Sequence, residues 1–124
     1  MSRIALLIDD SMLIRHAVGR LLEARGFSVE IATDGAAALE ALKTVRPDVI
    51  FTDLQMPKLS GYQLIDALKA NTETANIPVL VLAAKPLAGD RPETRAHSII
   101  YKDLNIETQL NQVLENLFPS RSQT

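Results

Sequence analysis

The spacing of apolar residues along the chain constrains the fold more than any other feature of the sequence. Five short apolar runs alternate with longer stretches in which apolar residues recur at the period of an α-helix. The runs have the length of β-strands and cover residues 4–8, 27–31, 48–52, 79–83 and 98–101. The first run is apolar throughout, which is typical of a strand covered on both faces. The alternation predicts successive strand–helix–strand units.

Helices are expected between these strands and after the last one, at residues 11–25, 36–45, 62–70 and 106–118. Gly26 follows the first helix at the position where a left-handed residue commonly ends a helix. Pro47 stops the second helix. Asn105 is a candidate N-cap for the last helix.

The segment between the fourth and fifth strands contains Pro86, Gly89 and Pro92, so the fourth helix is expected to be short or irregular. Strands joined by helices make right-handed crossovers and form a parallel sheet between two helical layers. The predicted fold class is α/β, a doubly wound five-stranded parallel sheet with helices on both faces. The 124 residues suit one domain, assigned to residues 1–119, with residues 120–124 as a polar tail or the start of a linker.

The composition excludes several classes of function. The chain has no cysteine and therefore no disulfide, thiolate metal site or cysteine nucleophile. The net charge is −2 and the basic residues are scattered singly, which predicts no direct contact with nucleic acid. The apolar start at residues 4–8 is too short for a signal peptide or a membrane span. We therefore expect a cytoplasmic domain without a membrane partner.

Four charged residues follow strands of the predicted sheet. Asp9 and Asp10 come directly after the first strand, Asp53 after the third and Lys102 after the fifth. Sites in doubly wound sheets form where the carboxyl ends of the strands meet, so these side chains are expected to converge. Three carboxylates in a partly desolvated pocket require a cation or raised pKa values. Oxygen ligands without cysteine favour Mg²⁺, which leaves coordination positions for phosphate oxygens.

Such a pocket has a definite chemistry. A carboxylate within reach of a phosphate donor can act as a nucleophile and form an aspartyl-phosphate. The Lys102 ammonium would balance the charge of the incoming phosphoryl oxygens. Each residue alone has an ordinary explanation, because an aspartate after a strand is usually a turn former or a helix cap. Their joint placement at one edge of the sheet favours the functional interpretation.

Two motifs in these regions resemble the response-regulator receiver domains of two-component signalling. They are Ile8-Asp9-Asp10-Ser11 and the segment Thr52-Asp53-Leu54-Gln55-Met56-Pro57 with Gly61, accompanied by Lys102 after the fifth strand. The resemblance covers residues 4 to about 118. It implies a flavodoxin-like strand order 2-1-3-4-5 and a regulatory phosphoacceptor in a phosphorelay, not an enzyme.

The resemblance also implies roles for individual residues. Asp53 would accept a phosphoryl group from a histidine kinase or a phosphotransfer protein. Asp10 would bind Mg²⁺ directly, Asp9 largely through water, and Gln55 through its main-chain carbonyl. Lys102 would contact the phosphoryl oxygens.

The sequence departs from the family pattern at positions that normally respond to phosphorylation. Ala83 stands at the end of the fourth strand, where the family usually has serine or threonine. Ile99 stands at the usual place of an aromatic residue, with Tyr101 two residues later. Asp103 replaces the proline that usually follows the lysine. These differences predict a receiver in which phosphorylation is weakly coupled to a change of shape.

Two other functions are compatible with parts of the pattern. A pseudo-receiver would keep the fold and signal through protein contacts without phosphorylation. The changes at Ala83 and Ile99 favour it, and the complete acidic set opposes it. A small-molecule phosphohydrolase with an aspartyl nucleophile would need a general acid two residues after Asp53, and Gln55 does not provide one. The cognate kinase, the output partner and the oligomeric state are left open.

Overall fold

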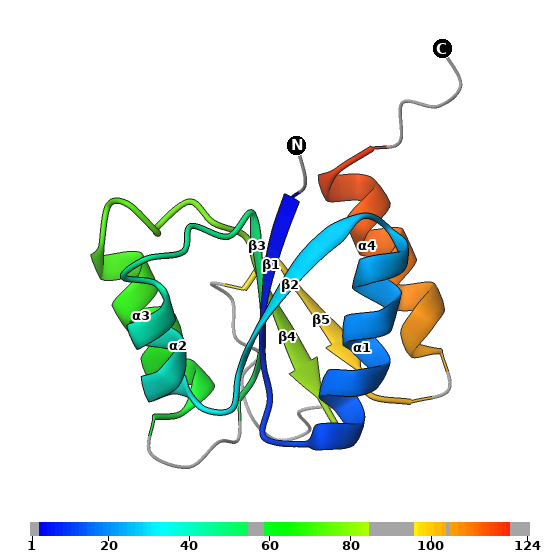
Figure 1. The fold of residues 1–124 in the computed structure, drawn as a ribbon, viewed down its shortest axis with the longest axis horizontal. Helices are drawn as coiled ribbons and strands as arrows, with labels where there is room; N and C mark the ends of the chain where they lie inside the picture. Colours follow the sequence, from blue (N-terminus) through cyan, green and yellow to red (C-terminus); the bar gives the residue numbers. More distant parts are fainter. Residues whose placement is uncertain (1–2, 55–58, 85–95, 104, 120–124) are drawn as a thin grey trace.

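The computed structural model describes residues 3–54, 59–84, 96–103 and 105–119. They contain one five-stranded sheet, built from β1 (Arg3–Ile8), β2 (Phe27–Ala32), β3 (Val49–Asp53), β4 (Val79–Ala83) and β5 (Ser98–Tyr101). The strand order is β2-β1-β3-β4-β5, and every pairing is parallel (Figure 1). The predicted doubly wound parallel sheet with order 2-1-3-4-5 is confirmed.

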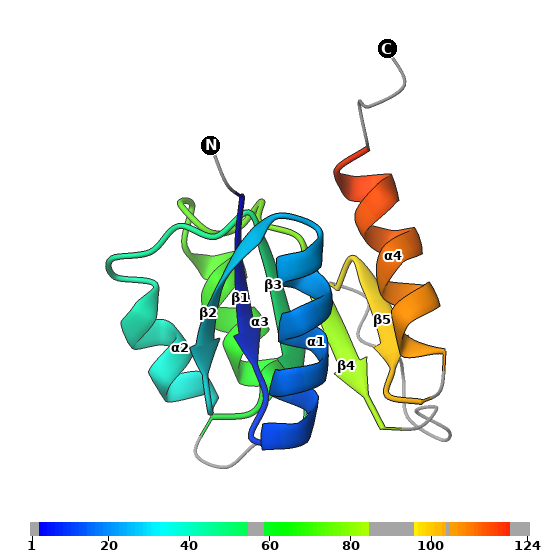
Figure 2. The same cartoon turned by 45° about the vertical axis from the view of Figure 1, so that its right-hand side comes forward.

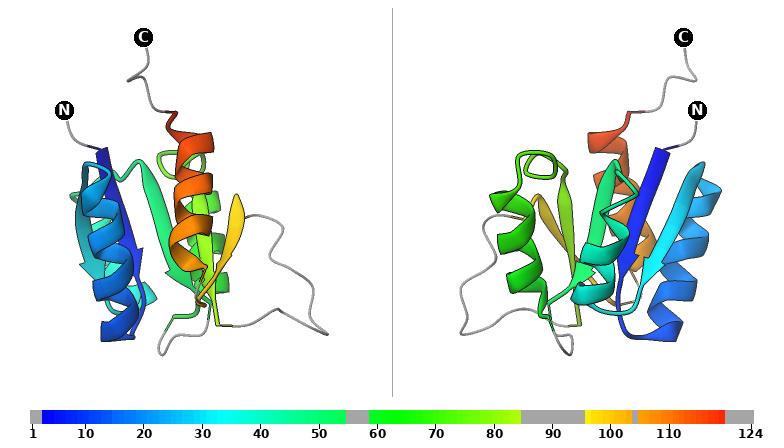
Figure 3. Two further views of the ribbon diagram at one scale, coloured as in Figure 1. Left: turned by 90° about the vertical axis from the view of Figure 1, so that its right-hand side faces the viewer. Right: turned by 60° about the vertical axis from the view of Figure 1, so that its left-hand side comes forward.

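The described residues form four helices: α1 (Met12–Ala24), α2 (Gly35–Ala41), α3 (Gly61–Ala70) and α4 (Ile106–Leu117). α1 and α4 cover one face of the sheet, and α2 and α3 cover the other (Figure 2, Figure 3). None of these four helices is long and apolar enough to cross a membrane. The helix expected between β4 and β5 falls mainly on residues 85–95, which lie outside the described part of the chain.

The sheet divides the core into two mainly aliphatic clusters. One cluster lies beneath α1 and α4 and includes Leu7, Val18 and Leu110. The other lies beneath α2 and α3 and includes Ile50 and Leu64. Four consecutive residues of β1 and of β3, and all of β4, are buried. This burial on both faces holds the carboxyl ends of the central strands in place.

The helix boundaries follow local capping rules. Ser11 and Asp34 cap α1 and α2 with side-chain oxygens that accept main-chain hydrogen bonds. α3 begins with a capping box between Ser60 and Gln63. Gly26 has a φ angle of 91°, the left-handed conformation predicted for the residue that ends α1.

α2 ends at Ala41, before the predicted end at Val45. The N–H groups of Lys43 and Thr44 bond to carbonyls three residues back, at 3.2 and 3.1 Å, so the last turn is tightened. Thr44 and Val45 are β-branched, and Pro47 disfavours helical backbone at the residue before it. The prediction of helix through Val45 is wrong, because the residues before Pro47 already disfavour helical backbone.

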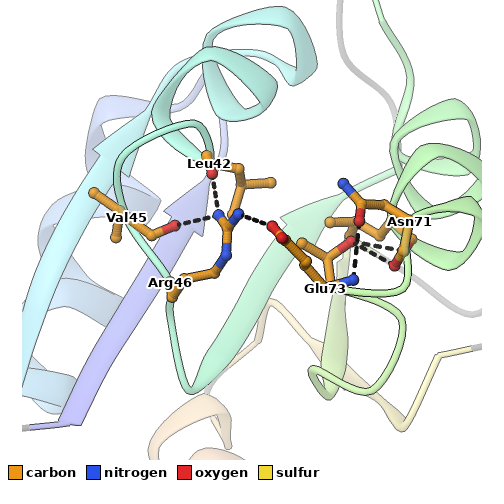
Figure 4. A network of polar contacts seen from close by, with 7 residues as sticks. Leu42, Val45, Arg46, Asn71 and Glu73 are labelled. Atoms are coloured by element: carbon orange, nitrogen blue, oxygen red, sulfur yellow. Dashed lines mark hydrogen bonds and ion pairs between the residues drawn. The ribbon is translucent and has the colours of Figure 1, made fainter.

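Arg46 fixes the chain after α2 (Figure 4). Its Nη1 donates to the carbonyls of Leu42 and Val45, and its Nη2 forms an ion pair with Glu73 in the connection between α3 and β4. Asn71 Oδ1 accepts a hydrogen bond from the Glu73 N–H at 2.9 Å. These contacts join the segment that follows α2 to the segment that follows α3, near the amino ends of β3 and β4.

Asn105 occupies the N-cap position of α4, but its side chain makes no capping hydrogen bond. The predicted side-chain cap is therefore wrong. The Asn105 N–H donates to Asp103 Oδ1 at 2.8 Å, and the Ile106 N–H donates to the Asp103 carbonyl at 3.1 Å. An aspartate that bonds the N–H two residues on forms a local turn, and this turn leads into α4 instead.

Candidate functional site

The carboxyl edge of the sheet gathers the three aspartates that the sequence places there. Asp9 follows β1, Asp10 comes next, and Asp53 is the last residue of β3. One carboxylate oxygen from each residue lies within 4.8 Å of the other two. The proximity follows from the topology, because β1 and β3 are neighbours and end at the same level.

Asp9 is the most enclosed member of this acidic cluster. It is fully buried, its Oδ1 accepts a hydrogen bond from the Ser11 N–H at 2.9 Å, and its main-chain carbonyl accepts one from Arg15 Nη1 at 2.8 Å. Its Oδ2 is buried, and among the described residues its partner is the Lys102 ammonium. The Ser11 N–H thus holds Oδ1 of the Asp9 carboxylate, and Oδ2 points into the cluster.

Lys102 reaches this cluster from the end of β5. Its Nζ lies 2.8 Å from Asp9 Oδ2 and 3.2 Å from Asp53 Oδ2, and its side chain is only 12% exposed. Burial by itself would lower the pKa of Lys102, but the hydrogen bonds and charges of Asp9 and Asp53 outweigh burial and raise it above its ordinary value. The lysine is therefore a held positive charge between two aspartates.

The donor set suits a hard divalent cation. Three carboxylates face one ammonium, so negative charge exceeds positive charge in the cluster. Asp10 is exposed and the Asp53 side chain is partly exposed, so an ion from solvent can reach the cluster from the side of Asp10. Within the described ranges, the buried Asp9 Oδ2 has the Lys102 ammonium as its partner and retains lone pairs for a cation. Oxygen ligands with excess negative charge fit Mg²⁺.

α3 approaches the end of β3 closely because it begins with a glycine. The Gly61 N–H donates to the Leu54 carbonyl at 3.1 Å. A Cβ added at Gly61 would collide with the Asp53 carbonyl oxygen and lie 2.8 Å from Leu54 Cα. Only glycine permits this approach, which packs the start of α3 against the main chain of Asp53.

The sequence also predicted a metal ligand at Gln55 and two altered switch positions at Ala83 and Ile99. Gln55 lies outside the described residues. Ala83 is buried at the end of β4, opposite Tyr101 of β5. Ile99 is half-buried and packs against the core cluster beneath α2 and α3. Neither Ala83 nor Ile99 has a side-chain group that could bond a phosphoryl oxygen.

Sequence reasoning missed two residues that support the site. Arg15 holds the main-chain carbonyl of Asp9 from one turn into α1. Gln109 of α4 bonds both main-chain groups of Tyr101, at 2.9 and 3.0 Å. Arg15 had a local signal, because a long side chain in the first turns of a helix can reach the preceding loop. Gln109 had none, because its contacts depend on how α4 packs beside β5.

Comparisons with known proteins agree with this geometry. The family model for the response regulator receiver domain matches residues 5–114. The gliding motility regulatory protein of Myxococcus xanthus is 44% identical over 79 residues, which are 64% of this chain and 10% of that protein. The response regulator MprA of Mycobacterium sp. strain KMS is 35% identical over 86 residues, which are 69% of this chain and 36% of that protein. The chain thus spans between a tenth and just over a third of the length of these relatives.

Solved structures show the same architecture. The chemotaxis response regulator CheY4 of Vibrio cholerae has a TM-score of 0.82 at 28% identity, and the likeness covers 95% of this chain and 100% of that one. The receiver domain of a sensor histidine kinase from Pseudomonas aeruginosa has a TM-score of 0.85 at 24% identity, covering 97% of this chain and 100% of that one. That structure has a magnesium ion coordinated in its active-site cleft. Since the family model spans most of its length, the chain belongs to the response regulator receiver domain family.

Proposed function

We propose that Asp53 accepts a phosphoryl group and that the domain acts as the receiver in a two-component phosphorelay. The observation that carries the proposal is the ion pair between Asp53 Oδ2 and Lys102 Nζ at 3.2 Å, within the acidic cluster. Lys102 pairs with Asp9 and Asp53, and of these two aspartates only Asp53 has a partly exposed side chain. A donor can therefore reach Asp53 while the buried strand β3 holds its main chain.

The transfer step follows from these positions. An Asp53 carboxylate oxygen attacks the phosphorus of the donor, and the bond between phosphorus and the donor breaks as the new P–O bond forms. The electron pair of the broken bond leaves with the donor group, which then takes a proton from solvent. Lys102 Nζ pairs with a phosphoryl oxygen and offsets the negative charge that the phosphoryl group adds beside Asp9 and Asp10.

Asp9, Asp10 and Asp53 would hold Mg²⁺, and the resemblance adds the main-chain carbonyl of Gln55 as a further ligand. When bound, the ion neutralises the carboxylates and the phosphoryl oxygens. The magnesium ion in the Pseudomonas aeruginosa receiver supports the choice of this metal for the experiments.

The donor is proposed to be a histidine kinase or a phosphotransfer protein. Met12 and Leu13, in the first turn of α1 beside Asp10, are 75% and 77% exposed. Two adjacent exposed apolar side chains beside the acidic cluster offer a surface that suits the apolar part of a protein contact. An apolar donor surface seated there would bring its phosphoryl group to the acceptor.

Intact-protein mass spectrometry after incubation with acetyl phosphate and Mg²⁺ tests the acceptor. The wild-type chain should gain one phosphoryl group, and Asp53→Asn should gain none. Asp66→Asn, which changes an exposed aspartate of α3, is the matched control and should label like wild type. Chelation of Mg²⁺ should slow labelling. An unlabelled wild-type chain would favour the pseudo-receiver, and a labelled Asp53→Asn would assign the phosphoryl group to another residue.

A further inference from the structure

Gln109 holds the end of the edge strand β5 through its side-chain amide. Its Oε1 accepts a hydrogen bond from the Tyr101 N–H at 2.9 Å, and its Nε2 donates to the Tyr101 carbonyl at 3.0 Å. Nε2 also lies 3.3 Å from Asp103 Oδ1, as a second donated bond. One amide thus satisfies both main-chain groups of a strand residue, as a neighbouring strand would.

Lys102 lies between the two residues that Gln109 holds. The Lys102 N–H donates to the Ala83 carbonyl at 2.8 Å, so the main chain here is attached to β4 on one side and to α4 on the other. Asp103 is held further by the bond between its Oδ1 and the Asn105 N–H at 2.8 Å. The direction in which the chain presents the Lys102 side chain is therefore set by these bonds.

The contacts of Lys102 leave little tolerance for a shift of its main chain. Its Nζ lies within hydrogen-bonding distance of both Asp9 and Asp53, at 2.8 and 3.2 Å. A lysine side chain is flexible and loses considerable rotamer freedom when held. A fixed starting point at the main chain reduces the number of conformations that the side chain must give up.

We propose that Gln109 is a positioning residue for Lys102 and, through it, for phosphoryl transfer to Asp53. This inference rests on the proposed function of Asp53. Gln109 does not touch the acceptor; it holds the main chain of Tyr101 before the lysine and the side chain of Asp103 after it. The Gln109 amide restrains a segment in which Asp103 follows the lysine, at the position where the family usually has a proline.

Gln109→Met tests this role, because it removes the amide and keeps the length of the side chain. Gln112→Met is the matched control, since Gln112 is the same residue type on the exposed side of the same helix. With acetyl phosphate and Mg²⁺, the rate of Asp53 labelling should fall about 5- to 50-fold in Gln109→Met, as expected for a displaced charged group. The rate should stay within about twofold of wild type in Gln112→Met. Thermal unfolding of both variants shows whether each is folded at the assay temperature.

A double-mutant cycle distinguishes positioning from a general effect on stability. If Gln109 acts through Lys102, Gln109→Met should not slow labelling further in a Lys102→Ala background. Mass spectrometry over long reaction times measures the slow labelling of these chains. Equal slowing in both backgrounds would overturn the inference, as would equal rates for Gln109→Met and Gln112→Met. The wild-type chain is labelled in the same series: if it gains no phosphoryl group, the proposed function fails and this inference fails with it. If it labels and the variants do not differ, only the inference fails.

Discussion

Asp9 and Lys102 form an ion pair in which the carboxylate is completely buried and the lysine nearly so. Removing one partner of a buried pair leaves the other charge without compensation, which costs more than the pair itself contributes. The folded chain therefore needs a positive charge near the buried Asp9 carboxylate to offset the cost of burying it. Lys102 supplies that charge within the described residues, and a metal ion at the acidic cluster would supply it as well.

Lys102→Met should lower the free energy of unfolding by about 1–3 kcal/mol in metal-free buffer, since the buried Asp9 loses its counter-charge. Added Mg²⁺ should recover more of this loss in the variant than it adds to wild type, because the ion replaces the ammonium. Urea unfolding with and without Mg²⁺ measures both effects. Lys43→Met, which removes an exposed pair with Glu40, is the control and should change stability by less than about 1 kcal/mol. A Lys102→Met chain as stable as this control would contradict the argument.

The raised pKa of Lys102 adds a dependence on alkaline pH. A lysine whose pKa is higher in the folded than in the unfolded chain stabilises the fold fully below the unfolded value, here 10.5, and this contribution is lost as pH rises through the folded value. Without metal, wild type should therefore lose more stability than Lys102→Met as pH rises above 10.5. Urea unfolding across this range provides the comparison, and parallel curves for the two chains would exclude the linkage.

At the scale of elements, strands were easier to predict than helix ends. β4 and β5 begin and end at the predicted residues, because a short, mostly apolar run of strand length indicates a strand directly. The predicted end of α2 lay too far along the chain. The β-branched residues Thr44 and Val45 disfavour helix before Pro47 is reached. The Asn105 cap was predicted by residue type alone, and the turn made by Asp103 takes its place.

The candidate site was predictable where it depends on topology. Asp9, Asp10, Asp53 and Lys102 each follow a strand, and the carboxyl-edge rule brings such residues together. The Gln109 contacts depend on the placement of α4 against the edge strand, which no local pattern encodes. The sequence therefore predicted the acidic residues and Lys102, but not the Gln109 side chain that bonds the main chain of Tyr101 beside Lys102.

The start of α3 offers a test of how an element positions the acceptor. Gly61→Ala should lower the free energy of unfolding by about 1–3 kcal/mol, because the new Cβ overlaps the Asp53 and Leu54 main chain. It should also slow Asp53 labelling by acetyl phosphate. Gly19→Ala is the matched control: it lies in α1, its Cβ would meet only Leu7 Cδ2 at 4.0 Å, and it should be neutral or stabilising by up to about 1 kcal/mol. Gly61→Ala with wild-type stability and labelling rate would show that α3 does not constrain Asp53.

The first turn of α1 offers a second test, of the proposed donor surface. Leu13→Ala removes a side chain that is 77% exposed and makes no core contact. It should leave labelling by acetyl phosphate unchanged and slow transfer from a phosphorylated kinase or phosphotransfer protein by about tenfold, the size of a moderate contact at an interface. Parallel assays with the two donors make the small molecule an internal control. Equal rates of phosphoryl transfer from the protein donor to the variant and to wild type would show that Leu13 does not contact the donor.

At the scale of the whole molecule, the acceptor site and the far half of the sheet are joined through β4 and β5. Asp53 in β3 pairs with Leu82 of β4, and Ala83 of β4 pairs with Tyr101 of β5. A phosphoryl group shifts the shape of the domain only if it makes different contacts in two states. Ala83 and Ile99 have no polar side-chain group, so we predict that a phosphoryl group on Asp53 makes no side-chain hydrogen bond to β4 or β5 at these two positions.

Phosphorylation of the wild-type chain should therefore change backbone amide chemical shifts around Asp9, Asp53 and Lys102, with little change from Ile77 to Leu80 and from Ala96 to Ile99. Ala83→Ser supplies a hydroxyl at the end of β4. A hydrogen bond to a charged group is worth about 1.5–3 kcal/mol, so the variant should spread the shift changes into β4 and β5. Ala83→Gly, which changes the same position without a donor, is the control. A large rearrangement of β4 and β5 in the phosphorylated wild-type chain would show that this receiver couples phosphorylation to shape through residues other than Ala83 and Ile99.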